Sequence, residues 1–120
     1  MDLDKLKFPG FPEPQQTWNF PNCINGWVGR LTGAEFKVLW YILRHTYGWQ
    51  KEEDSISIIQ FCKGIKKRDG GWLDKGTGLN KETVTLALRS LRTKGFIRVF
   101  RGKDAKGKFL VTRYKVKRKS

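Results

Sequence analysis

The sequence predicts a small α+β domain. Three observations support this prediction. Apolar residues recur at helical spacing in residues 33–47 and again in residues 80–94. Apolar and polar residues then alternate in residues 96–101 and 109–116, as they do in strands with one solvated face. The length of 120 residues fits one domain with a modest core.

The N-terminal segment is expected to be extended, because all four prolines fall within residues 1–21. Its apolar anchors are Phe8, Phe11, Trp18 and Phe20. Asn22 is the expected N-cap of a short helix over residues 23–30, which carries on one face Ile24, Trp27 and Val28. Residues 22–117 are expected to form the folded domain, and residues 118–120 a frayed basic tail.

Residues 33–47 are expected to form the central helix. Thr32 and Glu35 fit a capping box at its start, and Gly48 is expected to end it in the left-handed conformation. The predicted buried face consists of Phe36, Leu39, Trp40, Leu43 and Tyr47. His45 falls on the flank, away from that face.

The middle of the chain predicts short elements. Lys51–Asp54 is expected to be a turn, and residues 55–57 a short strand with Ile56 inward. Ser57 is a suitable N-cap for a following helix, whose apolar residues are Ile58, Ile59, Phe61, Cys62 and Ile65. Residues 66–78 contain four glycines and predict a long loop. Within it, Trp72 is expected to cover the edge of the core, with stacking on an unpaired base as the alternative.

The last elements are a helix and a hairpin. Asn80 is the expected N-cap of the helix, and Gly95 its end. Its predicted buried stripe is Val84, Ala87, Leu88 and Leu91, and the residues expected opposite that stripe are Glu82, Thr85, Leu86, Arg89 and Thr93. The strands at 96–101 and 109–116 enclose the basic turn GKDAKGK and predict a β-hairpin.

This order of elements is the layout of a winged helix-turn-helix, with a three-helix core, a short strand and a C-terminal β-hairpin wing. In that architecture the last helix enters the major groove of DNA. The strand at 55–57 is expected to pair with the hairpin, since a third strand supports a hairpin that is marginal alone.

Charge is distributed unevenly along the chain. Residues 1–58 carry six Lys/Arg against seven Asp/Glu, a net charge of −1, whereas residues 59–120 carry nineteen against four, a net charge of +15. A folded basic half indicates a polyanionic partner, and double-stranded DNA is the favoured one. A membrane surface is not favoured, because no basic helix carries a broad apolar face.

Three stretches of the sequence carry a family resemblance, namely FPN at 20–22, LTGAEFKVLWYILRHTYGWQKEEDSIS at 31–57 and GTGLNKETVTLALRSLRTKGFI at 76–97. They resemble the N-terminal domain of bacteriophage replication protein O and its relatives. The resemblance covers about residues 18–116. It implies a winged-helix domain that binds replication-origin DNA. It also implies a replicative helicase or other replication proteins as partners, through a region outside this chain, and a homodimer on repeated DNA sites.

The candidate DNA contacts fall into two groups. The expected base contacts are Lys81, Thr85 and Arg89, on the helix at 80–94. The expected contacts to the DNA backbone are Lys66, Lys67, Arg68, Arg92, Arg101, Lys103, Lys106 and Lys108. The alternative for each is a solvated charge. Leu86 is expected either to touch thymine methyl groups or to show that the helix phase is shifted by one position.

Catalytic, metal and cofactor sites are not expected. His45 lacks a nucleophile and an orienting partner at suitable spacing, and Cys23 and Cys62 do not complete a metal site with it. The consecutive acids at 52–54 are expected to form a turn. The acidic, proline-broken start is unlike a signal peptide, so a cytoplasmic setting is expected.

The predicted function is sequence-specific binding of double-stranded DNA in phage-type or plasmid-type replication. A transcription regulator of the same fold is the nearest alternative, since nothing in the helix separates the two. A protein-interaction adaptor and an RNA-binding protein also stay open.

Overall fold

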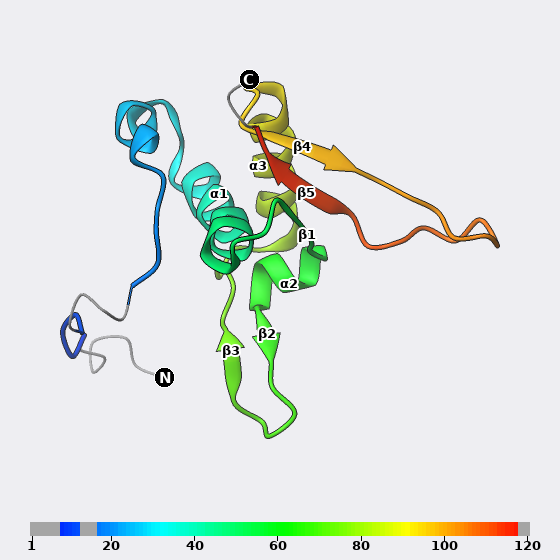
Figure 1. Cartoon of the computed structure of the whole chain (residues 1–120), viewed down its shortest axis with the longest axis horizontal. Coiled ribbons are helices and arrows are strands. Elements are labelled where there is room, and N and C mark those ends of the chain that lie inside the picture. The colour runs from blue at the N-terminus through cyan, green and yellow to red at the C-terminus, as the bar shows by residue number, and fades with distance from the viewer. Residues whose placement is uncertain (1–7, 13–16, 118–120) are drawn as a thin grey trace.

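The computed structural model describes residues 8–12 and 17–117. These contain three α-helices and two antiparallel sheets, a small α+β fold (Figure 1). The helices are α1 (Gly33–Thr46), α2 (Ile58–Lys63) and α3 (Lys81–Thr93). The strands are β1 (Glu53–Ser55), β2 (Ile65–Lys66), β3 (Trp72–Asp74), β4 (Ile97–Phe100) and β5 (Arg113–Val116). The expected arm at 1–21 lies partly outside the described residues, and the expected tail at 118–120 lies wholly outside them.

The predicted capping box at the start of α1 is confirmed. The Thr32 hydroxyl accepts from the Glu35 backbone N–H at 3.1 Å, and the Glu35 carboxylate accepts from the Thr32 N–H at 2.8 Å. The predicted end of this helix at a left-handed Gly48 is wrong. The chain continues through a 3-10 turn, η4 (Tyr47–Trp49), and the left-handed residue is Gln50, with φ of 55°.

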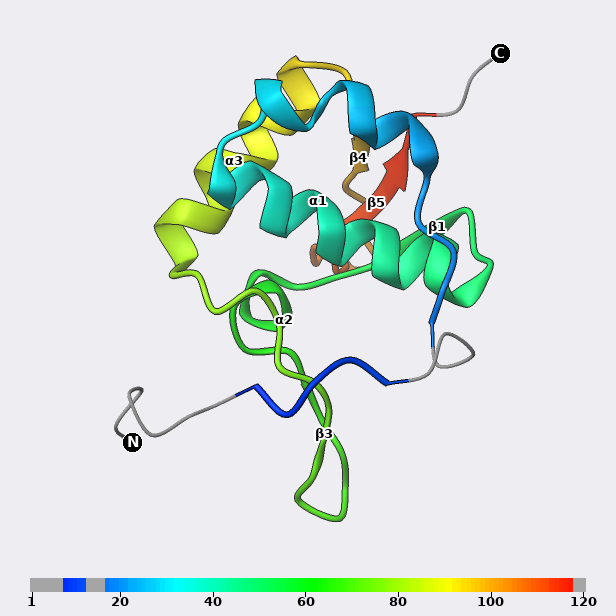
Figure 2. The same cartoon turned by 90° about the vertical axis from the view of Figure 1, so that its left-hand side faces the viewer.

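The deepest face of α1 is rotated from the predicted one. Leu39 and Leu43 are buried as predicted, but Phe36, Trp40 and Tyr47 are only half-buried, whereas Val38, Tyr41 and Ile42 are fully buried. His45 is also buried, so its predicted place on an uncovered flank is wrong. The reason is that α1 packs on several sides, against α3, against β5 and against the N-terminal segment (Figure 2).

The predictions for α3 are confirmed. Asn80 caps the helix by accepting from the Thr83 N–H at 2.8 Å, and the predicted stripe of Val84, Ala87, Leu88 and Leu91 is buried. Gly95 follows the helix with φ of 86°, a left-handed conformation that favours glycine. The helix phase is therefore fixed, and α3 presents a defined face to solvent.

A three-stranded antiparallel sheet has the order β1-β5-β4. The predicted third strand therefore exists and pairs with the C-terminal hairpin, the segment 97–116 that contains β4 and β5. It lies two residues earlier than predicted, at Glu53–Ser55 rather than 55–57, so the acids expected in a turn belong partly to the strand. Ile56 follows it and is buried, and Ser57 caps α2 as predicted by accepting from the Gln60 N–H at 3.1 Å.

The predicted long loop at 66–78 is wrong. It contains most of a second β-hairpin, in which β2 and β3 pair antiparallel. This middle hairpin, residues 65–74, leaves the core in a different direction from the C-terminal hairpin (Figure 1). Trp72 lies on β3 and is exposed, so its predicted place at the core edge is also wrong.

The short helix predicted at 23–30 is instead two 3-10 turns, η2 (Asn22–Gly26) and η3 (Val28–Arg30). Asn22 begins the first turn and is not its cap, and no side chain caps it. Ile24 is buried, whereas Trp27 and Val28 are exposed. Gly26 and Gly29, which have low helix propensity, interrupt the segment.

Candidate nucleic-acid interface

A cleft of about 400 Å³ separates α3 from the C-terminal hairpin. Its lining includes four of the predicted DNA contacts, namely Thr85, Arg89, Arg92 and Arg101. The apolar floor is formed by Ile58, Leu88 and Val99 with the ring of Tyr114. The structure therefore brings together the Thr85 hydroxyl and three guanidinium groups from α3 and from the C-terminal hairpin that follows it.

Lys81 lies outside this cleft, at the first residue of α3. The Thr85 hydroxyl donates to the Lys81 carbonyl at 2.8 Å, one turn earlier in the helix. Lys81, Thr85 and Arg89 therefore follow one another along successive turns of α3, and all three are exposed. This arrangement can present three polar side chains in a row to an elongated ligand.

The three arginines of the cleft form no ion pair within the described part of the chain. Other cations near the sheet are paired: Arg113 lies 2.7 Å from Glu53, and Lys115 lies 3.8 Å from Glu52. Burial raises the pKa of the Tyr114 phenol, and the nearby charge of Arg101 partly offsets this effect. The positive charge of the three arginines is thus not neutralised by ion pairs among the described residues.

The tip of the C-terminal hairpin carries Lys103, Lys106 and Lys108, all exposed. Asp104, the acid of this tip, faces the turn itself, where its carboxylate accepts from the backbone N–H of Lys106 at 2.9 Å and of Lys108 at 3.0 Å. The carboxylate accepts hydrogen bonds within the turn, and among the three exposed lysines Lys103 places its Nζ 4.8 Å from the centre of the Phe109 ring. Exposed lysines of this kind are able to contact phosphates.

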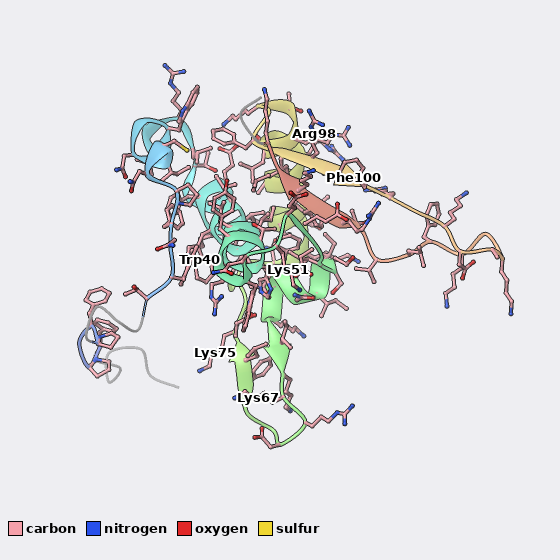
Figure 3. The ribbon with its side chains drawn as sticks, in the orientation of Figure 1. Trp40, Lys51, Lys67, Lys75, Arg98 and Phe100 are labelled. Carbon is pink, nitrogen blue, oxygen red and sulfur yellow. The ribbon has the colours of Figure 1, made fainter. Side chains whose placement is uncertain are left out.

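The predicted cluster of Lys66, Lys67 and Arg68 is not part of the cleft. It lies on the middle hairpin, on which Lys67 is labelled in Figure 3. All three side chains are exposed. The predicted backbone contacts therefore divide into two separate groups, one on the middle hairpin and one on α3 and the C-terminal hairpin.

Two cations near the cleft were not predicted. Arg98 and Lys117 share with Arg92 a second hollow, along β4 and the end of α3. Figure 3 shows Arg98 and Phe100 along β4. In the sequence, charged Arg98 alternates with apolar Ile97 and Val99, and this pattern could have predicted that Arg98 faces solvent. In the structure Arg98 is indeed exposed.

Leu86 lies on the solvent face of α3 and is 62% exposed. The alternative of a shifted helix phase is therefore wrong. The exposed face of α3 also includes Glu82, Thr85, Arg89 and Thr93, as predicted. A large apolar side chain thus stands among polar ones on this face.

A buried carboxylate holds α3 against α1. Glu35 accepts from Lys94 Nζ at 2.8 Å and also from the Ser90 hydroxyl, and Lys94 Nζ donates further to the Arg30 carbonyl at 3.2 Å. Burial by itself raises the pKa of Glu35, but the hydrogen bonds from Lys94, Ser90 and Thr32 outweigh it and lower this pKa from 4.5 to about 2. The network fixes the C-terminal end of α3 on the core.

His45 and the acids around it form a structural cluster. The Nε2 atom of His45 lies 3.0 Å from Asp74 Oδ2, and its Nδ1 atom lies 3.5 Å from Asp54 Oδ2. No group of three or more His, Cys, Asp or Glu that could hold a metal ion occurs among the described residues. Nor does any helix of that part of the chain have the length and apolar character needed to cross a membrane.

Comparison of the chain with known protein-family models and with curated proteins gave no match. The function is therefore inferred from the residues and their geometry, together with the resemblance of the three stretches quoted above.

Proposed function

We propose that the chain is a winged-helix domain that binds specific sequences in double-stranded DNA. In this proposal α3 is the recognition helix and the C-terminal hairpin is the wing. The observation that carries the proposal is the cleft between them, in which Thr85, Arg89, Arg92 and Arg101 gather without internal ion partners among the described residues. The net charge of +15 on residues 59–120 supports a polyanionic ligand.

Binding begins with electrostatic capture and ends with contacts to base edges. The α3 helix enters the major groove, where Arg89 donates two hydrogen bonds to a guanine and Thr85 contacts a neighbouring base. Lys81 approaches a base edge or phosphate near the helix N-terminus, where free backbone N–H groups add to its charge. Arg92 and Arg101 contact the flanking phosphates, and the tip of the wing supplies Lys103, Lys106 and Lys108. Lys66, Lys67 and Arg68 add backbone contacts from the middle hairpin.

The proposed biological role is recognition of a replication origin in phage-type or plasmid-type DNA replication. The three quoted stretches between residues 20 and 97 support it through their resemblance to phage replication proteins. On this proposal the chain acts by binding and not by catalysis, in the cytoplasm, and needs no cofactor. Partner replication proteins bind through regions outside this chain, and repeated sites place copies of it side by side on DNA.

The proposal is tested by selecting bound duplexes from a random pool. Enrichment of one motif supports specific binding, and enrichment of repeated copies supports the origin role. Titrations on a selected and a scrambled duplex at several salt concentrations then test the residues.

Replacing Arg89 by alanine should weaken binding to the selected duplex by about 10- to 100-fold, because about 1–3 kcal/mol of base discrimination is lost. Binding to the scrambled duplex should change little. Lys106→Ala should weaken both duplexes alike and reduce the salt slope by about 1. Lys37→Ala, an exposed lysine of α1, is the control. Unchanged binding in both variants would reject the groove model.

A second candidate function is a protein-interaction adaptor. The observation that favours it is a run of exposed apolar residues on the C-terminal hairpin, Phe109, Leu110 and Val111, which are 68%, 55% and 53% exposed. Absence of any enriched duplex in the selection would favour this function over DNA binding.

A further inference from the structure

The middle hairpin is fixed rigidly to the core at its base. Gly64 and Gly76 are so close that a Cβ atom on Gly76 would lie 2.6 Å from the Gly64 backbone nitrogen. The Phe61 carbonyl accepts from both the Thr77 N–H, at 2.7 Å, and the Thr77 hydroxyl, at 2.8 Å. The Gly78 N–H donates to the Cys62 carbonyl at 3.1 Å. These contacts tie the base of the hairpin to the end of α2.

A second anchor joins the hairpin to α1. Asp74, the last residue of β3, accepts from the Tyr41 hydroxyl at 2.8 Å and from the Gly76 N–H at 2.9 Å. Its other carboxylate oxygen lies 3.0 Å from His45 Nε2. Tyr41 and His45 are both buried. Both ends of the hairpin, at Gly64 and at Asp74, are therefore held against the core.

Both acids of the hairpin face inward or into its own turn. Asp74 faces the core, and Asp69 accepts from the Gly71 N–H at 2.8 Å. The cations Lys66, Lys67 and Arg68 form no ion pair within the described part of the chain. The exposed part of the hairpin thus carries three cations against one exposed carboxylate, that of Asp69.

An exposed aromatic ring lies within this positive surface. Trp72 is 45% exposed and pairs across the hairpin with Lys66, whose Nζ lies 5.9 Å from the centre of the ring. Its neighbour Leu73 is 49% exposed. Cations can bind phosphates, and an exposed indole can pack on the apolar surface of sugars and bases. Nucleic acid offers both kinds of surface side by side.

The position of the hairpin relative to α3 decides which part of the DNA it can meet. It ends at Asp74, shortly before α3 begins at Lys81, whereas the C-terminal hairpin follows the other end of α3. The two hairpins thus flank the helix in sequence, and they project in different directions (Figure 1). Beyond the edge of the major groove, a duplex presents first a phosphate backbone and then the minor groove.

We propose that the middle hairpin is a second DNA-binding arm, which contacts duplex DNA beyond the site bound by α3. Trp72 packs into the adjoining minor groove, and Lys66, Lys67 and Arg68 contact the phosphates at its edges. Apolar side chains inserted into a minor groove are a common way for proteins to bind and bend DNA. This inference rests on the proposed function, because it requires α3 in the neighbouring major groove.

The test compares two duplexes that share the selected site. The short duplex ends at the edge of that site, and the long one adds about ten base pairs, one helical turn, on the side facing the N-terminus of α3. The wild-type chain should bind the long duplex about tenfold more tightly. Trp72→Ala and the double variant Lys67→Ala/Arg68→Ala should lose this preference and leave the added segment open to hydroxyl-radical cleavage. In Trp72→Ala, binding to the short duplex should be unchanged.

Trp27→Ala is the matched control, because Trp27 is 46% exposed and lies far from the middle hairpin in the sequence. It should keep the preference for the long duplex. Since Trp72 lies outside the core, its replacement should leave the circular-dichroism spectrum and the melting temperature unchanged, which excludes misfolding as the cause.

Three outcomes overturn the inference. Equal binding of both duplexes by the wild-type chain, or an unchanged preference in the Trp72 variant, would show that the hairpin does not contact the flank. Tighter binding when the added segment is left unpaired, lost in Trp72→Ala, would assign the ring to stacking on single-stranded bases. Failure to select any duplex at all would reject the proposed function itself, so the two failures are distinguishable.

Discussion

Leu86 and Glu35 show how single side chains of α3 and its neighbour divide between contact and support. Leu86 is exposed on the face of α3 that the proposal places in the major groove. Its replacement should change DNA affinity more than the stability of the fold. Glu35 is buried and accepts hydrogen bonds from Ser90 of α3 and from Lys94 at its end. Its replacement should change the stability of the fold more than DNA affinity.

We expect Leu86 to contact a thymine methyl group. Replacing the contacted thymine by uracil removes one methyl group and should weaken wild-type binding about fourfold, the equivalent of about 0.8 kcal/mol of apolar contact. Leu86→Ala should bind both duplexes equally, with an unfolding free energy within about 0.5 kcal/mol of wild type, as for an exposed site. Thr93→Ala, on the same face, is the control. Sensitivity to uracil that survives in Leu86→Ala would contradict this contact.

The Glu35 network should stabilise the fold in a pH-dependent way. Its pKa is lowered in the folded chain to about 2, so the carboxylate contributes stability above pH 4.5 that is lost as pH falls toward 2. Glu35→Gln should be less stable than wild type at pH 7 by about 2 kcal/mol, the size of a charged hydrogen bond. In urea titrations this difference should narrow below pH 4.5. A difference that stays constant from pH 7 to pH 2.5 would show that the charge of Glu35 is not what matters.

At the level of elements, the features that could be predicted from the sequence are those that depend on residues close together in the chain. The cap and buried stripe of α3 follow from residues within one segment, and so does the capping box of α1. The true inward face of α1 depends on the N-terminal segment, α3 and β5 packing on different sides of it. No periodicity within residues 33–47 specifies that, and His45 was therefore misplaced.

The middle hairpin was missed for a physical reason. Its strands are two and three residues long, too short for an alternating pattern, and its four flanking and internal glycines are typical of loops. Its stability comes from contacts distant in sequence, such as those of Asp74 with Tyr41 and His45. Most cations of the candidate interface could be predicted from the sequence, but Arg98 and Lys117 were not, and the separation of the middle hairpin's cations from the cleft required the structure.

Gly64 should be essential to this element. Its φ of 85° and ψ of −159° favour glycine, and a Cβ atom there would lie 2.2 Å from the Asp74 carbonyl oxygen. The backbone conformation alone should cost Gly64→Ala about 1–3 kcal/mol of unfolding free energy. The overlap with Asp74 should make the loss larger than that. Gly70→Ala is the control, since Gly70 has φ of 92° but no atom within 4 Å of its added Cβ. Equal losses in thermal or urea unfolding would show that the close packing of Gly64 is unimportant.

At the level of the whole molecule, positive charge is placed at the ends of projections and acids are kept at their bases or inside their turns. The dependence of DNA affinity on salt should report this arrangement. Each phosphate neutralised changes the slope of log affinity against log salt by about −0.9.

With Arg92, Arg101, Lys103, Lys106 and Lys108 on phosphates, the slope on a short duplex should be about −4 to −5. On a longer duplex that also reaches Lys66, Lys67 and Arg68, it should steepen to about −7. Fluorescence anisotropy at several salt concentrations measures both slopes. A slope near zero would show that the basic half does not bind DNA electrostatically, and equal slopes would restrict the contacts to one hairpin.

The two anchors of α1 have a geometrical consequence. Through Glu35 this helix contacts α3, and through Tyr41 and His45 it contacts the middle hairpin. The helix α1 therefore supports both α3 and the middle hairpin. Inserting one base pair between their contact sites turns one site relative to the other by about a tenth of a helical turn. Because α1 holds both, α3 and the middle hairpin should not follow that rotation independently. On the proposed mode of binding, the affinity of the chain should therefore depend on the helical phase between the two DNA segments as well as on their sequence, although α1 itself is not among the proposed contacts.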